Sequence, residues 1–133
     1  MNTSSQQSTK SWESTLVTPD TTLGDAVATL DRSALRIALV VDGERRLLGT
    51  LTDGDVRRAL LKHLSLAVPV REVMCATPQA AQLDWTRERI LAVMESRQLL
   101  HLPLIDREGH VVGLETLHGL LNRKVLSNPV LLM

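Results

Sequence analysis

Apolar and polar residues follow each other along this chain in an order that predicts a helix, a β-hairpin and a second helix. A continuous apolar run at 37–41 and a second run at 47–51, with polar residues between them, predict the two strands of the hairpin. Apolar residues three or four positions apart, beginning at Leu23, predict a helix before the hairpin. A helix at 55–63 follows it, and a short strand is expected near Leu16.

The same order returns 64 residues later as a weaker copy. We expect a helix from Thr86, strands at 102–105 and 111–114, and a final helix from Thr116. Between the two sets, residues 70–74 are apolar at alternate positions, which is consistent with a short connecting strand or turn. The offset also aligns turn and cap residues: Asp42 with Asp106, Glu44 with Glu108, Gly49 with Gly113, and Thr52 with Thr116.

This duplication predicts the fold class and the domain organisation. Each half alone would leave one face of its sheet in water, so we expect the halves to pack across a pseudo-two-fold axis and form two related clefts. The predicted fold is α/β (α+β), with two β-α-β-β-α repeats at residues 12–68 and 69–126. Residues 1–11, which are rich in Ser, Thr and Gln, are expected to form a disordered lead.

Composition and charge narrow the range of partners. The 133 residues have a net charge of zero and are 44% apolar, which suits one domain and provides no global field for nucleic acid or an anionic membrane. Trp12 and Trp85 are the only aromatic side chains among Phe, Trp and Tyr, so stacking platforms for single-stranded nucleic acid are missing. The single cysteine and the lack of an apolar stretch of about 18 residues predict a cytoplasmic chain without disulfide or membrane span.

The turn that joins the second strand to its helix carries the candidate chemistry. Thr52, Asp53, Gly54 and Asp55 open the helix, where backbone amides and the helix dipole favour an anion, and Arg58 adds a cationic donor. Asp55 would repel a phosphate but can accept hydrogen bonds from ribose hydroxyls, so a nucleoside phosphate satisfies both features. The alternative is a capping box, in which Thr52 and Asp55 stabilise the helix start. The two interpretations are compatible.

These features resemble a tandem pair of CBS domains, also called a Bateman module. The resemblance rests on the repeat, on strands that end IALVVD and LPLID, and on a glycine followed by threonine at plus three, with aspartate at plus six in the first copy. It implies two clefts between the repeats, in which adenine nucleotides (AMP, ADP or ATP) commonly bind. It also implies that Thr52 contacts phosphate or ribose, that Asp55 binds the ribose hydroxyls, and that the main chain at Arg36 and Ile37 flanks the base.

The second half matches this pattern only in part. Thr116 keeps the position of the first threonine, and Leu100 with His101 matches the base-flanking pair. Gly119 stands where the first copy has Asp55, so the second site is expected to be empty, weaker or differently selective. For His101, the alternative is a partly buried strand histidine without a ligand.

A narrower resemblance concerns the end of the chain. LTDGDVRRALL and the closing NPVLLM resemble the N-terminal regulatory segment of sugar-phosphate nucleotidyltransferases, so 127–133 is expected to begin a truncated downstream catalytic domain. The sequence has no nucleophile elbow, phosphate loop or paired-carboxylate cleft, and we predict no catalytic residues in it. We expect a homodimeric regulatory module whose bound adenine nucleotide modulates the attached domain. The alternative is a structural dimerisation module without ligand.

The histidines do not suggest a metal centre at this stage. No two of them share a helical turn, and no carboxylate stands in a recognised ligand register with one of them. We therefore predict no metal site at these four residues: His63, His101, His110 and His118.

Overall fold

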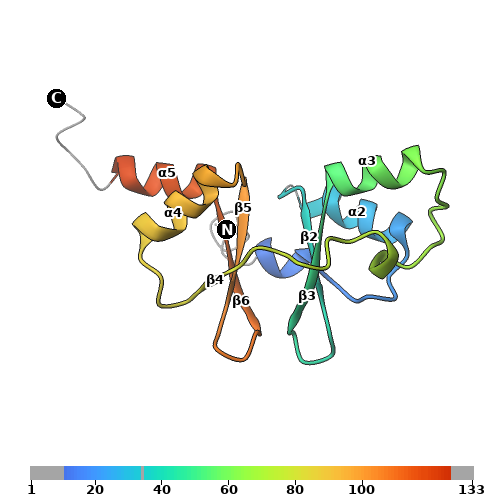
Figure 1. Ribbon diagram of the computed structural model, residues 1–133, viewed down its shortest axis with the longest axis horizontal. Helices are drawn as coiled ribbons and strands as arrows, with labels where there is room; N and C mark the ends of the chain where they lie inside the picture. Colours follow the sequence, from blue (N-terminus) through green and yellow to red (C-terminus); the bar gives the residue numbers. More distant parts are fainter. Residues whose placement is uncertain (1–10, 34, 127–133) are drawn as a thin grey trace, which may run out of the picture.

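The computed structural model describes residues 11–33 and 35–126. Within these residues, two three-stranded sheets lie side by side at the centre, and the α-helices cover their outer faces (Figure 1). The first repeat contains η1 Ser11–Thr15, β1 Leu16–Val17, α2 Leu23–Ser33, β2 Ile37–Val41, β3 Leu47–Thr52 and α3 Asp53–Leu61. The second contains η2 Val70–Glu72, β4 Ala81–Gln82, α4 Arg87–Ser96, β5 His101–Ile105, β6 Val111–Thr116 and α5 Leu117–Leu126.

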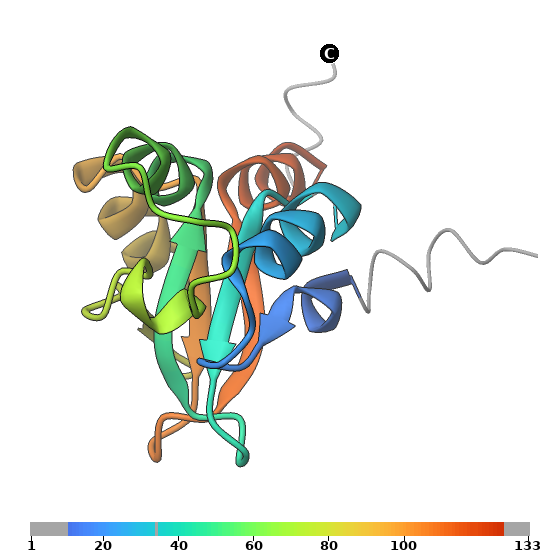
Figure 2. The ribbon, with the colours of Figure 1, turned by 90° about the vertical axis from the view of Figure 1, so that its right-hand side faces the viewer.

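The predicted α/β (α+β) fold of two β-α-β-β-α repeats is confirmed. In each repeat the first strand is parallel to the second, and the second is antiparallel to the third. Even the register shift recurs, between Val40 and Val41 in β2 and between Leu104 and Ile105 in β5. The helices gather toward one end of the molecule, and the two hairpin turns project at the other (Figure 2).

One buried cluster joins the two repeats. β2 is a continuous apolar strand and is buried on both faces. Ala38 and Val40 pack in the core of the first repeat, whereas Ile37, Leu39 and Val41 pack with Val111 of the second repeat. The second repeat has its own cluster: Ala81, Ile90, Met94, Leu102 and Leu120. The two halves therefore share a core, as expected for a single domain.

Backbone hydrogen bonds also connect the two hairpins near their turns. The amide of Leu47 donates to the carbonyl of Gly109 at 2.9 Å, and the amide of Val111 donates to the carbonyl of Arg45 at 2.8 Å. Arg45 and Gly109 are equivalent residues, and both have positive φ, 67° and 92° respectively. The turns are thus fixed against each other across the pseudo-two-fold axis.

Several expected elements differ from the structure. Helix α3 begins at Asp53 and not at 55, because Thr52 is its N-cap. For residues 70–74, where a short strand or turn was expected, the structure has a short 3₁₀ helix, a turn and a bend, so the strand alternative is wrong. The first strand of the second repeat, β4, was missed because two residues give no recognisable alternation; the 64-residue offset from β1 would have located it.

The predictions for the two ends of the chain fall mostly beyond the described residues. Of the expected disordered lead at 1–11, only Ser11 is described, and it begins η1. The expected start of a downstream domain at 127–133 lies outside them. No helix among the residues that the structure describes is long and apolar enough to cross a membrane.

Candidate functional site

Two cavities lie between the repeats, and the 64-residue offset relates the residues that line them. The first, of about 520 Å³, is lined by residues 52–54 at the start of α3 and by 99–101 at the start of β5. The second, of about 650 Å³, is lined by 116–118 at the start of α5 and by 35–36 before β2. Both volumes are in the range of small-molecule sites, roughly 300–1,000 Å³. The duplication therefore produces the expected pair of clefts.

The first cavity has a polar end and an apolar wall. Thr52 and the first residues of α3, Asp53 and Gly54, form the polar end, where the first-turn amides of a helix lack intrahelical acceptors. Gly54 carries no side chain, which leaves the main chain approachable. The apolar wall is contributed by both repeats and by the segment between them: Ile37, Pro78, Leu99, Leu100 and Pro103.

An ion pair stands between the two cavities. The Arg36 guanidinium donates to Oδ2 of Asp53, with its Nε at 3.0 Å and its Nη2 at 2.9 Å. Both residues line both cavities, and so do Leu100 and His101. Arg36 has a φ of 62°, a left-handed conformation that costs energy for a residue other than glycine. Both side chains are more than half exposed, so the pair adds little stability and can rearrange around a ligand.

Asp55 does not line the large cavity. It is 8% exposed, and its carboxylate is fully used within α3: Oδ2 accepts from the amide and the hydroxyl of Thr52 at 2.9 and 3.2 Å, and Oδ1 accepts from Nη2 of Arg58. Asp55 and Arg58 line a separate cavity of about 80 Å³. The helix-cap interpretation therefore describes Asp55 as it stands. Its contact with a ribose remains a prediction that requires these hydrogen bonds to rearrange.

The second cleft is built differently at the equivalent position. The Thr116 hydroxyl accepts a hydrogen bond from the amide of Gly119 at 3.0 Å, whereas the Thr52 hydroxyl donates to a carboxylate. A Cβ at residue 119 would lie 2.8 Å from Thr116 Oγ1, so any side chain there would displace the threonine. Of the predicted site residues, Thr52, Arg36, Ile37 and His101 share the first cavity, whereas Thr116 lies in the second.

Two contacts were not predicted from the sequence, one at the first cleft and one outside both clefts. Cys75 is exposed and lines the first cavity, because its amide and carbonyl pair with Thr50 on β3 at 2.8 and 3.1 Å. Outside both clefts, Nδ1 of His110 lies 3.0 Å from Oδ2 of Asp106 across the second hairpin turn. Thr50 and Cys75 are far apart in the sequence, and the four-residue separation of Asp106 and His110 falls in a turn and not in a helix.

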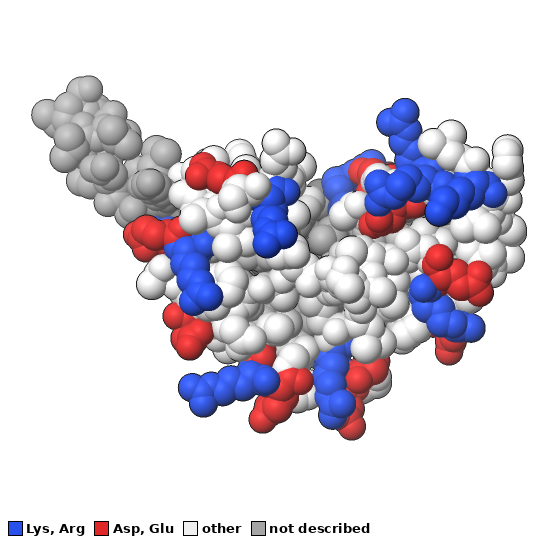
Figure 3. Space-filling view, viewed as in Figure 1, with Lys and Arg blue, Asp and Glu red and all other residues white. Residues whose placement is uncertain are grey.

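Charged side chains form separate groups on the face drawn in Figure 3. Lys and Arg side chains gather over α3 with acidic side chains beside them, while the middle of this face is uncharged. This pattern agrees with a solvated helix face for the basic residues of α3, Arg57 and Arg58.

His101 gives the site a pH dependence. Burial lowers the pKa of the His101 imidazole below 6.5, and the opposing effects of the Leu35 backbone and the Asp53 charge do not cancel this. The unfolded chain therefore takes up the proton first as the pH falls below about 6.5, and the folded state loses stability until its own lower pKa is passed. We expect the urea midpoint to fall more between pH 7.5 and pH 5.5 in the wild type than in His101→Gln. His63→Gln, at an exposed position, should retain the wild-type dependence; identical profiles for wild type and His101→Gln would contradict the prediction.

Comparison with known proteins gives a consistent result. The chain matches the CBS domain twice, at residues 13–62 and 70–124. An uncharacterized protein of Helicobacter pylori (strain J99) is 36% identical over 107 residues, which cover 80% of this chain and 32% of that protein. Inosine-5'-monophosphate dehydrogenase of Methanocaldococcus jannaschii is 31% identical over 108 residues, 81% of this chain and 21% of that enzyme. Arabinose 5-phosphate isomerase KdsD of Pseudomonas aeruginosa is 29% identical over 107 residues, 80% and 33% of the two chains.

Solved structures match over nearly the same part of the chain. A protein with CBS domains from Burkholderia ambifaria MC40-6 is 26% identical with a TM-score of 0.73, covering 84% of this chain and 82% of that one. The cytosolic domain of the Mg²⁺ channel MgtE in complex with ATP is 26% identical with a TM-score of 0.70, covering 81% and 44%. The chain spans about a third or less of the length of the three sequence relatives above.

Proposed function

The chain belongs to the CBS domain family, and on this premise we propose that it is a regulatory module that binds an adenine nucleotide in the first cleft and modulates an attached catalytic domain. The observation that carries the proposal is the cavity of about 520 Å³, which has a polar end at α3 and an apolar wall from both repeats. A nucleotide also has a polar part and an apolar part, since its phosphates and ribose are polar and its base is a flat, largely apolar ring.

The phosphate or ribose is assigned to the polar end. The amides at Asp53 and Gly54 provide donors, and the positive end of the helix dipole favours an anion. The Thr52 hydroxyl becomes a donor to the ligand when its hydrogen bond to Asp55 is released. Arg36 lies in the cavity wall, and release from Asp53 would free its guanidinium for a phosphate. The base is assigned to the apolar side, between Ile37 and Leu100.

Regulation follows from where the ligand lies. A ligand between the repeats contacts residues of both, so it favours the arrangement of the repeats that fits it best and shifts the equilibrium toward that arrangement. The relatives named above include two enzymes that are at least three times longer than the matched segment. In these two enzymes the segment similar to this chain is part of a longer protein, which supports the proposal that this chain is attached to an enzyme. A sugar-phosphate nucleotidyltransferase as that enzyme stays a prediction, since no relative named above is one.

Adenine nucleotide binding is supported by one structural neighbour, the MgtE cytosolic domain, which was solved with ATP. We expect AMP, ADP or ATP to give a saturable heat in calorimetric titration of the full chain. Thr52→Val should weaken the affinity about 10- to 100-fold, which corresponds to the loss of one hydrogen bond to a charged group. The matched variant Thr116→Val removes the equivalent hydroxyl from the second cleft and should leave the affinity unchanged.

Two results would overturn these assignments. Absence of heat with all three nucleotides at millimolar concentration would remove the nucleotide proposal, and equal weakening by both threonine variants would remove the preference for the first cleft. Circular dichroism of each variant checks that the helices persist.

A structural dimerisation module is the second candidate, and exposed leucines favour it. Leu60 and Leu61 on α3 are 51% and 70% exposed, and Leu121 on α5 is 40% exposed. Sedimentation that reports a homodimer with or without nucleotide, together with no titration heat, would favour this candidate over ligand regulation.

A further inference from the structure

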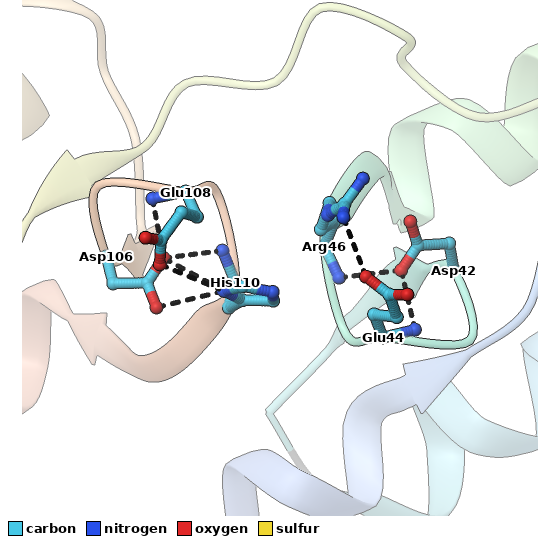
Figure 4. Close-up of polar contacts among 6 residues, drawn as sticks. All are labelled: Asp42, Glu44, Arg46, Asp106, Glu108 and His110. Atoms are coloured by element: carbon cyan, nitrogen blue, oxygen red, sulfur yellow. Dashed lines mark hydrogen bonds and ion pairs between the residues drawn. The ribbon is translucent and has the colours of Figure 1, made fainter.

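Three metal-ligating side chains converge at the turn between β5 and β6. One carboxylate oxygen of Asp106, one of Glu108 and one ring nitrogen of His110 all lie within 4.8 Å of one another. The Nδ1 atom of His110 is 3.0 Å from Oδ2 of Asp106 and 3.8 Å from Oε1 of Glu108. Figure 4 shows the three side chains on the inner side of the turn. None of them lines either cleft.

The turn holds two of these side chains in place without a ligand. The amides of Glu108 and His110 both donate to Oδ1 of Asp106 at 2.9 Å, which fixes the carboxylate. Asp106 and His110 are each 30% exposed at the side chain, whereas Glu108 is 77% exposed and free to swing in. Backbone hydrogen bonds to the first hairpin hold the turn from outside. A metal site needs ligands that are held near their binding geometry, and the backbone amides hold Asp106 in this way.

The first repeat contains the same turn with its own cation. Asp42 accepts hydrogen bonds from the amides of Glu44 and Arg46 at 2.8 and 2.9 Å, as Asp106 does in the second repeat. Glu44 then receives Nη2 of Arg46 at 2.6 Å, so a guanidinium neutralises the acidic turn (Figure 4). His110 occupies the position of Arg46. The second turn therefore keeps the two carboxylates of the first turn and has a metal-ligating imidazole in place of the guanidinium.

We propose that Asp106, Glu108 and His110 bind a divalent transition-metal ion, with water in the remaining coordination positions. One imidazole nitrogen with two carboxylate oxygens is a donor set that Zn²⁺ accepts, whereas Mg²⁺ prefers oxygen ligands alone. In the second turn the metal ion would neutralise the two carboxylates, as the Arg46 guanidinium does in the first turn. The neighbouring Arg46 charge is already balanced by Glu44, so it does not oppose the ion strongly.

The two hairpins provide reciprocal variants for the test. His110→Arg gives the second turn the residue set of the first, and Arg46→His gives the first turn the set of the second. In calorimetric titration of the full chain with ZnCl₂ at pH 7.5, the wild type should bind one ion through this turn. His110→Arg should weaken that binding at least about tenfold. Even the loss of a residue that only hydrogen-bonds to a metal ligand lowers metal affinity by about 10- to 100-fold, and His110 is itself a ligand. Arg46→His should raise the number of bound ions from one to two.

Specific outcomes would overturn the proposal. Equal Zn²⁺ affinity in wild type and His110→Arg would assign the ion elsewhere, and an unchanged stoichiometry in Arg46→His would show that the residue set does not suffice. Equal stabilisation by MgCl₂ and ZnCl₂ in thermal unfolding would show that the carboxylates act alone. His63→Ala should bind Zn²⁺ as the wild type does, and a loss of affinity in that variant would place the ion at His63. Nucleotide titrations are independent of all these results, because the clefts do not include the turn.

Discussion

Replacement of Asp55 by alanine is expected to lower the free energy of unfolding by about 2–3 kcal/mol. The carboxylate is almost fully buried and accepts from the Thr52 amide, the Thr52 hydroxyl and the Arg58 guanidinium. Loss of a helix N-terminal cap costs about 1 kcal/mol, and hydrogen bonds that involve charged groups are worth about 1.5–3 kcal/mol. Urea unfolding followed by far-ultraviolet circular dichroism measures the difference.

Two variants separate the causes of this loss. Asp53→Ala removes an exposed carboxylate from the same turn and should cost less than about 1 kcal/mol, since its ion pair with Arg36 is at the surface. Asp55→Asn keeps an acceptor for the Thr52 amide and should lie between the wild type and Asp55→Ala. If Asp55→Ala were as stable as Asp53→Ala, the hydrogen bonds described for Asp55 would not hold the helix start.

The same variants bear on ligand binding. Thr52 remains in the cavity wall when Asp55 is removed, so a nucleotide that uses Thr52 alone would bind Asp55→Asn with nearly wild-type affinity. A nucleotide that draws Asp55 toward its ribose would lose affinity in Asp55→Asn although the fold persists. Calorimetry of this one variant therefore distinguishes a cap from a ribose ligand.

Alanine at Gly49 is expected to destabilise the protein by about 2–3 kcal/mol. A Cβ there would lie 2.6 Å from Sδ of Met74 and 2.7 Å from the carbonyl oxygen of Cys75. The methionine can move, but the carbonyl belongs to the backbone that pairs with Thr50. Overpacking of this kind costs about 1–3 kcal/mol, and the displaced segment also carries Cys75 away from the first cavity.

The equivalent glycine provides the matched control. A Cβ at Gly113 would meet Cδ1 of Leu104 at 3.2 Å, which is the end of a flexible side chain. Gly113→Ala should therefore cost less than about 1 kcal/mol in the same urea experiment. An equal decrease in the free energy of unfolding in the two variants would mean that the backbone at Cys75 moves as easily as a leucine side chain.

Strand β2 was predictable from the sequence because a strand buried on both faces consists of consecutive apolar residues. Residues 37–41 are five apolar residues in a row, and β2 has these bounds because it is buried on both faces. The start of α3 was missed by two residues, because a threonine followed by polar residues can cap a helix at more than one position. β4 is too short for any pattern, and its pairing with β5 defines it.

The candidate site was predictable at the level of the cleft and not of its contacts. Thr52, Arg36 and Ile37 line one cavity, where the resemblance places them, whereas His101, expected beside Thr116 in the second cleft, lines both cavities. Spacing alone did not decide that the carboxylate of Asp55 turns inward to cap α3. The pair of Arg36 and Asp53, 17 residues apart, depends on the left-handed conformation of Arg36, which no periodicity encodes.

The shared core has a consequence for the origin of the asymmetry between the clefts. A chain with only the first repeat would expose the face of β2 that carries Ile37, Leu39 and Val41, and it could bury that face by pairing with a copy of itself. Every residue of such a pair would occur twice, in identical clefts and identical turns. When both copies belong to one chain, equivalent positions of the two repeats can carry different residues. Aspartate and glycine at the helix starts, and arginine and histidine at the turns, are differences that a pair of identical chains could not have.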